Sequence, residues 1–188
     1  MEDKMAPKNK ITRDEIIDAA VSFVEKHGKD ELNARALARE LGISTQPIFS
    51  NFGNMDELKK ELGVRSTKVY LKYIEDTAAS GLYPPYKSSG MAYIRFARER
   101  RELFKLTFMD NGGKYNAKAY DEIVKAMAKA ANISEEDAYE MHLRMWVFVH
   151  GIASLSATEF LEFDDEYASK MITDIYIGLI SKYTKKEN

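Results

Sequence analysis

The stretch Asn33–Met55, NARALARELGISTQPIFSNFGNM, decides the fold of this chain. Apolar residues recur at helical spacing from Ala34 to Leu41 and form one small apolar face. Gly42 follows the last of them, at the place where a left-handed helix C-cap favours a residue without a Cβ. We therefore predict a short helix over Asn33–Leu41 that ends at this glycine.

A second short helix is predicted over Ser44–Phe49. Ser44 is a favoured N-cap residue, and Pro47 is tolerated in a first turn because no intrahelical N–H donor is needed there. Two short helices joined through a glycine are typical of a helix-turn-helix, whose second helix enters the major groove of DNA by its N-terminal residues. The polar Thr45 and Gln46 suit that end of the helix. An ordinary helical hairpin is the alternative interpretation.

Helices with clear start signals flank this pair. Thr12–Glu15 forms a capping box, and the helix that it starts carries apolar residues inward until Gly28. Asn54–Glu57 is a second such start, and it opens a long helix whose apolar residues continue to Ile74. The predicted order is therefore one helix, the helix-turn-helix and a long exit helix.

This order resembles the tetracycline-repressor (TetR) family of bacterial one-component regulators. The resemblance covers residues 11–62 and is carried by Leu41-Gly42-Ile43-Ser44, Ile48-Phe49, Asn51-Phe52, Asp56 and Leu58. It implies that double-stranded operator DNA is contacted by residues around the turn. These residues are Asn33, Arg35, Ser44, Thr45, Gln46, Pro47, Phe49, Ser50 and Asn51.

The resemblance also implies separate roles within this set. Arg35, Thr45, Gln46 and Pro47 fall where members of the family contact bases, and Asn33 is expected to cap its helix. Arg makes paired hydrogen bonds to guanine O6 and N7, and Gln pairs in the same way with adenine N6 and N7. The alternatives are a solvated helix surface for Arg35 and plain helix-start chemistry for Thr45 and Gln46.

Three positions near the turn depart from the family pattern. Phe49 stands where a tyrosine usually offers its hydroxyl to phosphate, Asn51 replaces a histidine, and Met55 replaces a lysine. Residues 1–63 contain ten Lys and Arg against twelve Asp and Glu, a net charge of −2. Since nucleic-acid affinity usually depends on neutralised phosphates, any DNA surface here must be local, with helix N-termini and neutral donors contributing more than usual.

Composition agrees with a globular bacterial regulator. The chain has 188 residues, 45% of them hydrophobic, which is enough for one sizeable core or two modest ones. It contains no cysteine, so disulfides and thiolate metal sites are excluded. No segment has the length and apolarity of a membrane span or a signal peptide, and we expect a cytoplasmic protein whose first ten residues form a tail.

Beyond residue 63 the pattern stays helical, so we predict an all-α fold. Pro84 and Pro85 end the long helix, and further helices are predicted over 86–98, 102–109 and 115–131, from Ser134, and near the C-terminus. The expected domains are 11–63, a three-helix DNA-binding head, and 64–188, a larger body for ligand binding and dimerisation. The long helix from Asn54 is shared between them.

The body resembles the regulatory domains of one branch of the same family. This resemblance is carried by Met91-Ala92-Tyr93, Glu102-Leu103-Phe104 and Val149-His150-Gly151-Ile152-Ala153. It places aromatic and methionine side chains of five successive helices around a cavity for a small, mainly hydrophobic effector. Any one of them alone is more often a filled core residue, so only the cluster is informative. The expected ligand-binding residues are Tyr73, Tyr93, Phe96, Phe104, Phe108, Met127, His142, Met145 and Trp146.

Enzyme and metal chemistry find no support in the sequence. His142 and His150 lie two helical turns apart, too far to share one metal ion. The acidic run Glu162–Glu166 lacks the spacing of a calcium loop and suits the capping of the last helix. We expect no cofactor and no catalytic activity.

The remaining expectation is a homodimer through the last two helices. The segment Met145–Leu155 is apolar on more faces than one domain core can use, and Gly178 allows close helix approach. The overall prediction is a repressor that its ligand releases from the operator. The alternatives are a helical enzyme or lipid-binding protein with a vestigial head, and a regulator that binds another protein.

Overall fold

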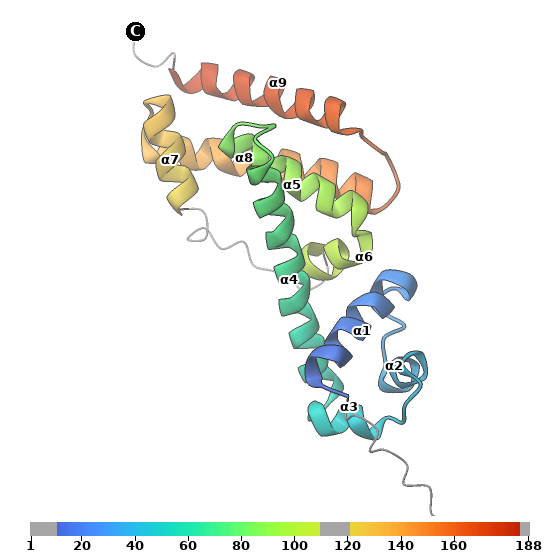
Figure 1. The fold of residues 1–188 in the computed structure, drawn as a ribbon. Coiled ribbons are helices and arrows are strands. Elements are labelled where there is room, and N and C mark those ends of the chain that lie inside the picture. The colour runs from blue at the N-terminus through green and yellow to red at the C-terminus, as the bar shows by residue number, and fades with distance from the viewer. Residues whose placement is uncertain (1–10, 110–120, 185–188) are drawn as a thin grey trace, which may run out of the picture. The chain divides into compact units, whose positions relative to one another are not determined.

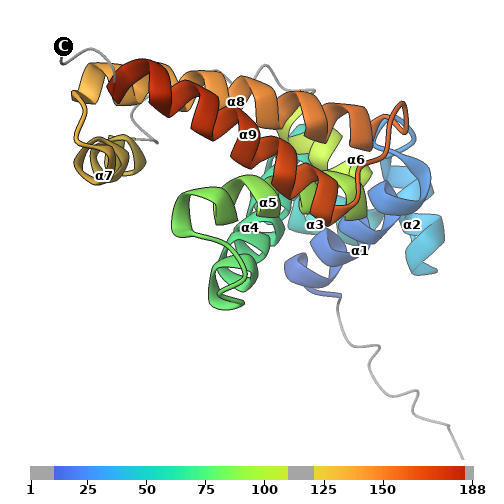
Figure 2. The same ribbon diagram turned by 90° about the horizontal axis from the view of Figure 1, so that it is seen from above.

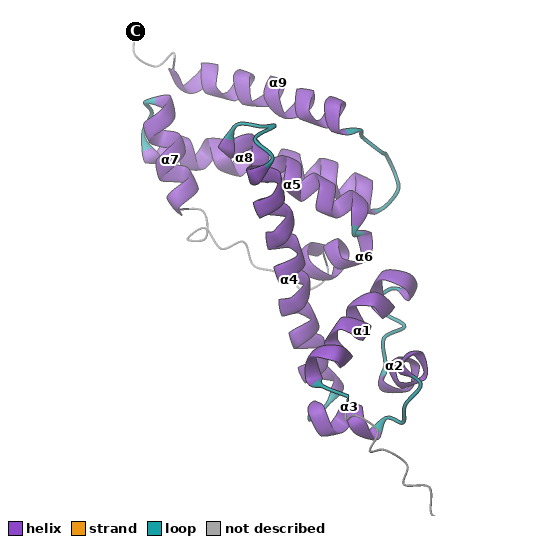
Figure 3. Cartoon of the chain, in the orientation of Figure 1, coloured by secondary structure: helices purple, strands orange, loops and turns teal. Residues whose placement is uncertain are grey.

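The computed structural model of the protein describes residues 11–109 and 121–184, and every regular element in these ranges is a helix (Figures 1 and 3). The prediction of an all-α fold is confirmed. None of the helices in these ranges has the length and apolarity needed to cross a membrane. The chain divides into two compact units, Met1–Thr67 and Lys68–Asn188, here called the N-terminal and C-terminal units. The division lies after Thr67 within one helix, whereas the expected boundary follows residue 63.

The N-terminal unit contains α1 (Arg13–His27), α2 (Ala34–Leu41), α3 (Gln46–Asn51) and the start of α4 (Met55–Ala79). The core of this unit is formed by apolar side chains of all four helices, and their order is the predicted one. The largest of them are Ile16, Phe23, Leu37, Ile48, Phe52, Leu58 and Leu62.

The helix ends of this unit follow mostly from local sequence. Thr12 and Glu15 form the predicted capping box, with hydrogen bonds in both directions. Asn33 Oδ1 accepts the Ala36 N–H at 3.0 Å, so it caps α2 as predicted. Gly42 adopts φ 63° and ψ 31°, the left-handed conformation expected after this helix.

The prediction that Ser44 caps the second short helix is wrong. The N-cap position is Thr45, its side chain makes no capping hydrogen bond, and α3 begins at Gln46. A capping side chain bonds the N–H of the second or third helical residue. Pro47 has no N–H and occupies one of these two positions for either cap residue, which weakens the side-chain cap.

The C-terminal unit contains the rest of α4, then α5 (Pro85–Glu99), α6 (Arg101–Phe104), the π-helix η1 (Lys105–Met109), α7 (Asp121–Ala131), α8 (Glu135–Ala157) and α9 (Asp165–Thr184). Nearly every residue of α5 from Met91 to Ala97 is buried, so this part of the helix lies inside the core of the unit. Helices α8 and α9 lie side by side in both views of the ribbon (Figures 1 and 2).

Two details of this unit differ from the prediction. The helix expected over 102–109 is a single turn of α-helix followed by a π-helix. The helix expected over 115–131 is described from Asp121, and its first six residues, like the tail 1–10, lie outside the described residues. Asp164 Oδ1 accepts the Tyr167 N–H at 2.7 Å, so the acidic run does cap the last helix.

Candidate functional site

The predicted DNA-contacting residues form an accessible surface along α2, the turn and α3. Arg35, Ser44 and Gln46 are exposed, and the Phe49 side chain has an exposed fraction of 47%. Ile48, in contrast, is fully buried and anchors α3 in the core of the N-terminal unit. Asn33 and Ser50 are also exposed, and Thr45, Pro47 and Asn51 are half-buried.

Hydrogen bonds divide this set into two groups. Ser50 Oγ donates to Gln46 O at 2.9 Å, and Asn51 Nδ2 donates to Pro47 O at 2.8 Å, so both side chains are used within their own helix. The side chains of Arg35 and Gln46, together with the hydroxyl groups of Ser44 and Thr45, make no hydrogen bond to other described residues. The donors and acceptors of this second group are therefore not used among the described residues.

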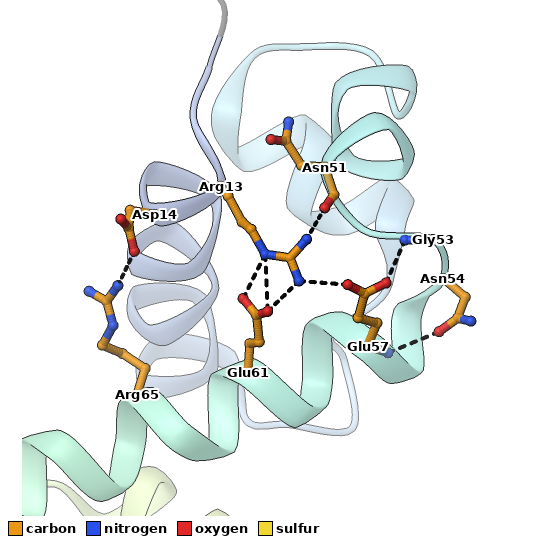
Figure 4. A network of polar contacts seen from close by, with 8 residues as sticks. All are labelled: Arg13, Asp14, Asn51, Gly53, Asn54, Glu57, Glu61 and Arg65. Carbon is orange, nitrogen blue, oxygen red and sulfur yellow. Dashed lines mark hydrogen bonds and ion pairs between the residues drawn. The ribbon is translucent and has the colours of Figure 1, made fainter.

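A charged network centred on Arg13 holds α3 against α1 and α4 (Figure 4). The Arg13 guanidinium donates to the Asn51 carbonyl, to Glu61 and, at 2.6 Å, to Glu57. It also lies 4.2 Å from the centre of the Phe52 ring. One arginine side chain therefore fixes the C-terminal end of α3 to the first turns of α4.

The same network explains the irregular start of α4. Asn54 Oδ1 accepts the Glu57 N–H at 2.9 Å, as in a capping box. The Glu57 carboxylate, however, accepts the N–H of Gly53 at 2.8 Å instead of that of Asn54. The predicted capping box is thus only half formed, because Glu57 is drawn toward Arg13.

Hydrogen bonds from the Arg13 side chain are the main cause of a lowered pKa at both Glu61 and Glu57. At Glu57 the hydrogen bond from the Gly53 N–H lowers the pKa further. A carboxylate whose pKa is lower in the folded than in the unfolded protein stabilises the fold above its unfolded pKa. It loses this effect as the pH falls through the folded value. Part of the stability of the N-terminal unit should therefore disappear in acid.

We expect Arg13→Met to lower the melting temperature at pH 7, because it removes the charge while keeping an apolar stem over Phe52. The difference from the unchanged protein should shrink as the pH falls below about 4.5, the usual glutamate pKa. Thermal melts between pH 3 and 7 measure this. Lys59→Met is the control, because Lys59 is exposed and has no ion pair within the described ranges. A difference that is independent of pH would contradict the assignment.

Pairing also determines which cations of the N-terminal unit can meet phosphates. Arg13, Lys26 and Arg65 are held by carboxylates, Arg65 by both Asp14 and Asp18. Arg35 and Arg39 on α2 and Lys59 and Lys60 on α4 are exposed and have no ion pair within the described ranges. The positive charge available for DNA is thus local, on α2 and the first turns of α4.

The C-terminal unit contains a cavity of about 380 Å³ with a mainly apolar wall. Helices α4, α5, η1, α7, α8 and α9 all contribute to it. The lining residues are Tyr70, Leu71, Ile74, Tyr86, Lys87, Ser89, Gly90, Tyr93, Phe108, Ile123, His142, Met145, Trp146, Val149 and Ile172.

The structure brings together five of the nine expected ligand-binding residues at this cavity: Tyr93, Phe108, His142, Met145 and Trp146. It places the other four elsewhere. Phe96 and Phe104 are fully buried core residues, and Met127 packs with Val124 and Met141 in a cluster formed by α7, α8 and α9. None of these three side chains is among the residues that line the cavity.

Tyr73, the fourth, borders a different hollow of about 560 Å³ between α4 and α5. Its hydroxyl donates to Glu99 at 2.9 Å, and burial together with this carboxylate raises the Tyr73 pKa to about 12. The wall of this hollow is strongly charged, with Lys68, Lys72, Arg95 and Arg100 facing Asp76 and Glu99. It does not resemble the apolar pocket that the sequence predicts.

Two tyrosine–histidine pairs join α5 to α8 at the main cavity. The Tyr86 hydroxyl lies 3.1 Å from His142 Nδ1, and the Tyr93 hydroxyl lies 2.9 Å from His150 Nδ1. Trp146 stacks on the His150 ring, with a distance of 5.1 Å between ring centres. Burial lowers the pKa of both histidines, which favours the neutral imidazole, and His142 is a polar group in the apolar wall of the cavity.

The lining residues that the sequence reasoning missed come mainly from α4 and the first turns of α5. Tyr70, Leu71 and Ile74 form one side of the wall, and Tyr86, Lys87 and Gly90 form another. The histidine spacing offers one signal. His142, Trp146 and His150 recur every four residues on one face of α8, and polar residues on such a face need partners from a facing helix.

Comparison with known proteins gives the family. Residues 16–62 match the family model "Bacterial regulatory proteins, tetR family", and residues 87–175 match the model "Tetracyclin repressor-like, C-terminal domain". Over 167 residues the chain is 22% identical to YobS, an uncharacterised HTH-type transcriptional regulator of Bacillus subtilis (strain 168). The match covers 86% of this chain and 87% of YobS.

Solved structures share the fold. A TetR-like transcriptional regulator from Rhodococcus sp. RHA1 superposes with a TM-score of 0.68 at 15% identity, over 94% of this chain and 99% of that one. The Streptomyces coelicolor TetR family protein ActR, solved in complex with (S)-DNPA, matches with a TM-score of 0.53 at 18% identity, over 95% of this chain and all of that one. The two matched family models follow each other in the expected order and together cover most of the sequence. The chain belongs to the tetracycline-repressor (TetR) family of bacterial transcriptional regulators.

Proposed function

We propose that this regulator is a cytoplasmic, homodimeric repressor without catalytic activity, which a small hydrophobic molecule releases from its operator. The observation that carries the proposal is the 380 Å³ cavity in the C-terminal unit, with its apolar wall and a few buried polar groups. Such a composition is typical of sites for small organic molecules. The complex of ActR with (S)-DNPA is an example of a protein of this fold holding one.

In this proposal the operator is contacted by the surface of α2, the turn and α3. Arg35, Thr45 and Gln46 face base edges, because their side chains are accessible and not used inside the protein. Ser44 and the nearby helix N-termini contact phosphates. Asn51 supports α3 through its bond to Pro47 instead of donating to DNA.

The proposed dimer uses α8 and α9. Val147 is 58% exposed, Gly151 lies one turn further along the same face of α8, and a Cβ on Gly151 would meet nothing within 4 Å. On α9, Ile175 and Gly178 form a similar face, and Gly178 is equally open. Small residues beside exposed apolar ones allow close helix approach by a second copy. A symmetric pair would set two α3 helices about 34 Å apart, one turn of DNA.

We expect Val147→Glu to convert the dimer to a monomer at micromolar concentration, because it places a charge in an apolar interface. Phe160→Glu is the matched control. It changes an equally apolar residue, 80% exposed, in the connection between α8 and α9. Light scattering coupled to size exclusion measures both variants. A monomer in the unchanged protein, or equal behaviour of the two variants, would refute the proposed interface.

The ligand would act through α4, which carries residues of both units. Leu58 and Leu62 of this helix belong to the core of the N-terminal unit, and Tyr70 and Ile74 line the cavity. A ligand alters DNA binding only if it binds better to a state with low operator affinity. By linkage, operator DNA must then weaken ligand binding by the same factor, which is about 5- to 150-fold for typical coupling.

The experiment that tests this proposal measures both directions. A library of hydrophobic compounds is screened by the fluorescence of Trp146, the only tryptophan of the chain, which borders the cavity. Each hit is then titrated with and without the protein's own upstream DNA. A factor clearly above one, and the same in both directions, is expected, and a bound compound with a factor of one would not be the effector. If no compound changes the fluorescence or raises the melting temperature, the C-terminal unit serves dimerisation alone.

A further inference from the structure

Among the described residues, the wall of the cavity carries one cation without an acidic partner. Lys87 lines the cavity, and no Asp or Glu is among the described residues that line it. Lys87 Nζ donates to the neutral Thr173 Oγ1 at 2.7 Å and lies 5.6 Å from the centre of the Tyr83 ring. Within the described ranges it forms no ion pair, although it is half-buried. Partial removal of an ammonium group from water costs free energy unless an anion pairs with it, so a bound anion would be favourable beside Lys87.

The surroundings of Lys87 add to this positive potential. Lys87 lies in the first turn of α5. This turn contains no acidic residue, and the helix has no side-chain cap at its N-terminus. Helix N-termini carry partial positive charge, so a lysine at this position is unfavourable for helix stability. Two of the neighbouring polar groups are satisfied within the protein, since Ser89 Oγ donates to Tyr86 O and the Tyr86 hydroxyl lies beside His142 Nδ1. The buried Ser88 hydroxyl has no hydrogen-bond partner among the described residues.

We propose that the effector is a hydrophobic monocarboxylate, whose carboxylate pairs with Lys87 while its apolar body lies against the aromatic wall. The wall supports a body of this kind, since Tyr93, Phe108 and Trp146 present ring surfaces to the cavity. A single lysine suits a single negative charge. This inference rests on the proposed ligand-binding function and adds the chemical class of the ligand.

The test compares ligand probes that share an apolar skeleton and differ in one functional group. Biphenyl-4-carboxylate, biphenyl-4-carboxamide and biphenyl-4-methylamine are titrated into the full-length protein by calorimetry, and decanoate and decanol provide a second, flexible body. We expect each carboxylate to bind at least about tenfold more tightly than its neutral partner, the gain of one charge-assisted hydrogen bond. The amine should bind most weakly.

Variants of the lysine then identify the group responsible. Lys87→Met should reduce the preference for the carboxylate to less than about twofold and leave the affinity for the carboxamide unchanged. Lys87→Arg should retain the preference, because it keeps the charge. Lys170→Met, which removes an exposed lysine of α9 that does not line the cavity, is the control and should behave as the unchanged protein.

The outcomes separate this inference from the function beneath it. Equal binding of the acids and their neutral partners would overturn the claim that the effector is a carboxylate. The cavity would then be a site for neutral hydrophobic ligands. A preference that survives Lys87→Met would place the carboxylate elsewhere and overturn the role of Lys87. If neither the biphenyl compounds nor the decyl compounds bind in any form, the ligand-binding function is overturned together with this inference.

Discussion

Replacing Phe96 by alanine should lower the free energy of unfolding of the C-terminal unit by about 3–5 kcal/mol. The Phe96 side chain is 0% exposed, and its ring packs against Tyr70, Tyr73, Phe104 and Phe108 at 5.4 to 6.4 Å between ring centres. The substitution removes apolar contact area and leaves a hole that this rigid group of rings cannot close. Few other single changes in this unit should cost as much.

Phe108→Ala is the matched comparison and should cost clearly less. The Phe108 ring belongs to the same group of aromatic rings, but it is half-buried and borders the cavity. Its removal enlarges an existing space, so it should change ligand affinity more than stability. Urea unfolding followed by Trp146 fluorescence reports on the C-terminal unit, at one protein concentration for all variants because a dimer is stabilised by mass action. If Phe96→Ala does not fold, Phe96→Leu gives a smaller loss to measure.

This pair of phenylalanines also shows what sequence periodicity cannot resolve. Spacing identifies Phe96, Phe104 and Phe108 as apolar positions on successive helices, and all three are expected at a cavity wall. In the structure, only Phe108 borders the empty space, and the other two fill the core beside it. Both environments select the same apolar side chains, so the difference arises only from how the helices pack together.

Local features of the N-terminal unit, in contrast, follow closely from the sequence. The Thr12 box, the Asn33 cap and the left-handed Gly42 each depend on residues within a few positions, and all three are present. The wrong prediction that Ser44 caps α3 also has a local cause, because Pro47 lacks the N–H that a capping side chain would bind. The Arg13 network, in contrast, joins Arg13 to Glu57 and Glu61, which lie 44 and 48 positions further along the chain. No local pattern predicts which carboxylates an arginine will meet.

For the proposed base-contacting surface, the sequence names candidate residues but does not show which of their side chains are used in hydrogen bonds within the protein. The sequence predicts both Gln46 and Ser50 as DNA contacts, and both are exposed. Only the structure distinguishes them, because the Ser50 hydroxyl bonds the Gln46 carbonyl while the Gln46 amide is left for a partner. This difference makes the two residues a test pair for recognition.

Gln46→Ala should weaken operator binding by about 1–3 kcal/mol at each half-site, and by about 2–6 kcal/mol for a symmetric dimer in which the change occurs twice. Gln46 is the first residue of α3, the end of a recognition helix that meets base edges. Its loss should also relax the preference at one base position in each half-site. Ser50→Ala, the control, should leave the preferred sequence unchanged because its hydroxyl is bound within α3. Selection from randomised sites, followed by anisotropy titrations at one salt concentration, measures both effects. Uniformly weaker binding with an unchanged preferred sequence would instead assign Gln46 to the phosphate backbone, and no change at all would remove it from the DNA surface.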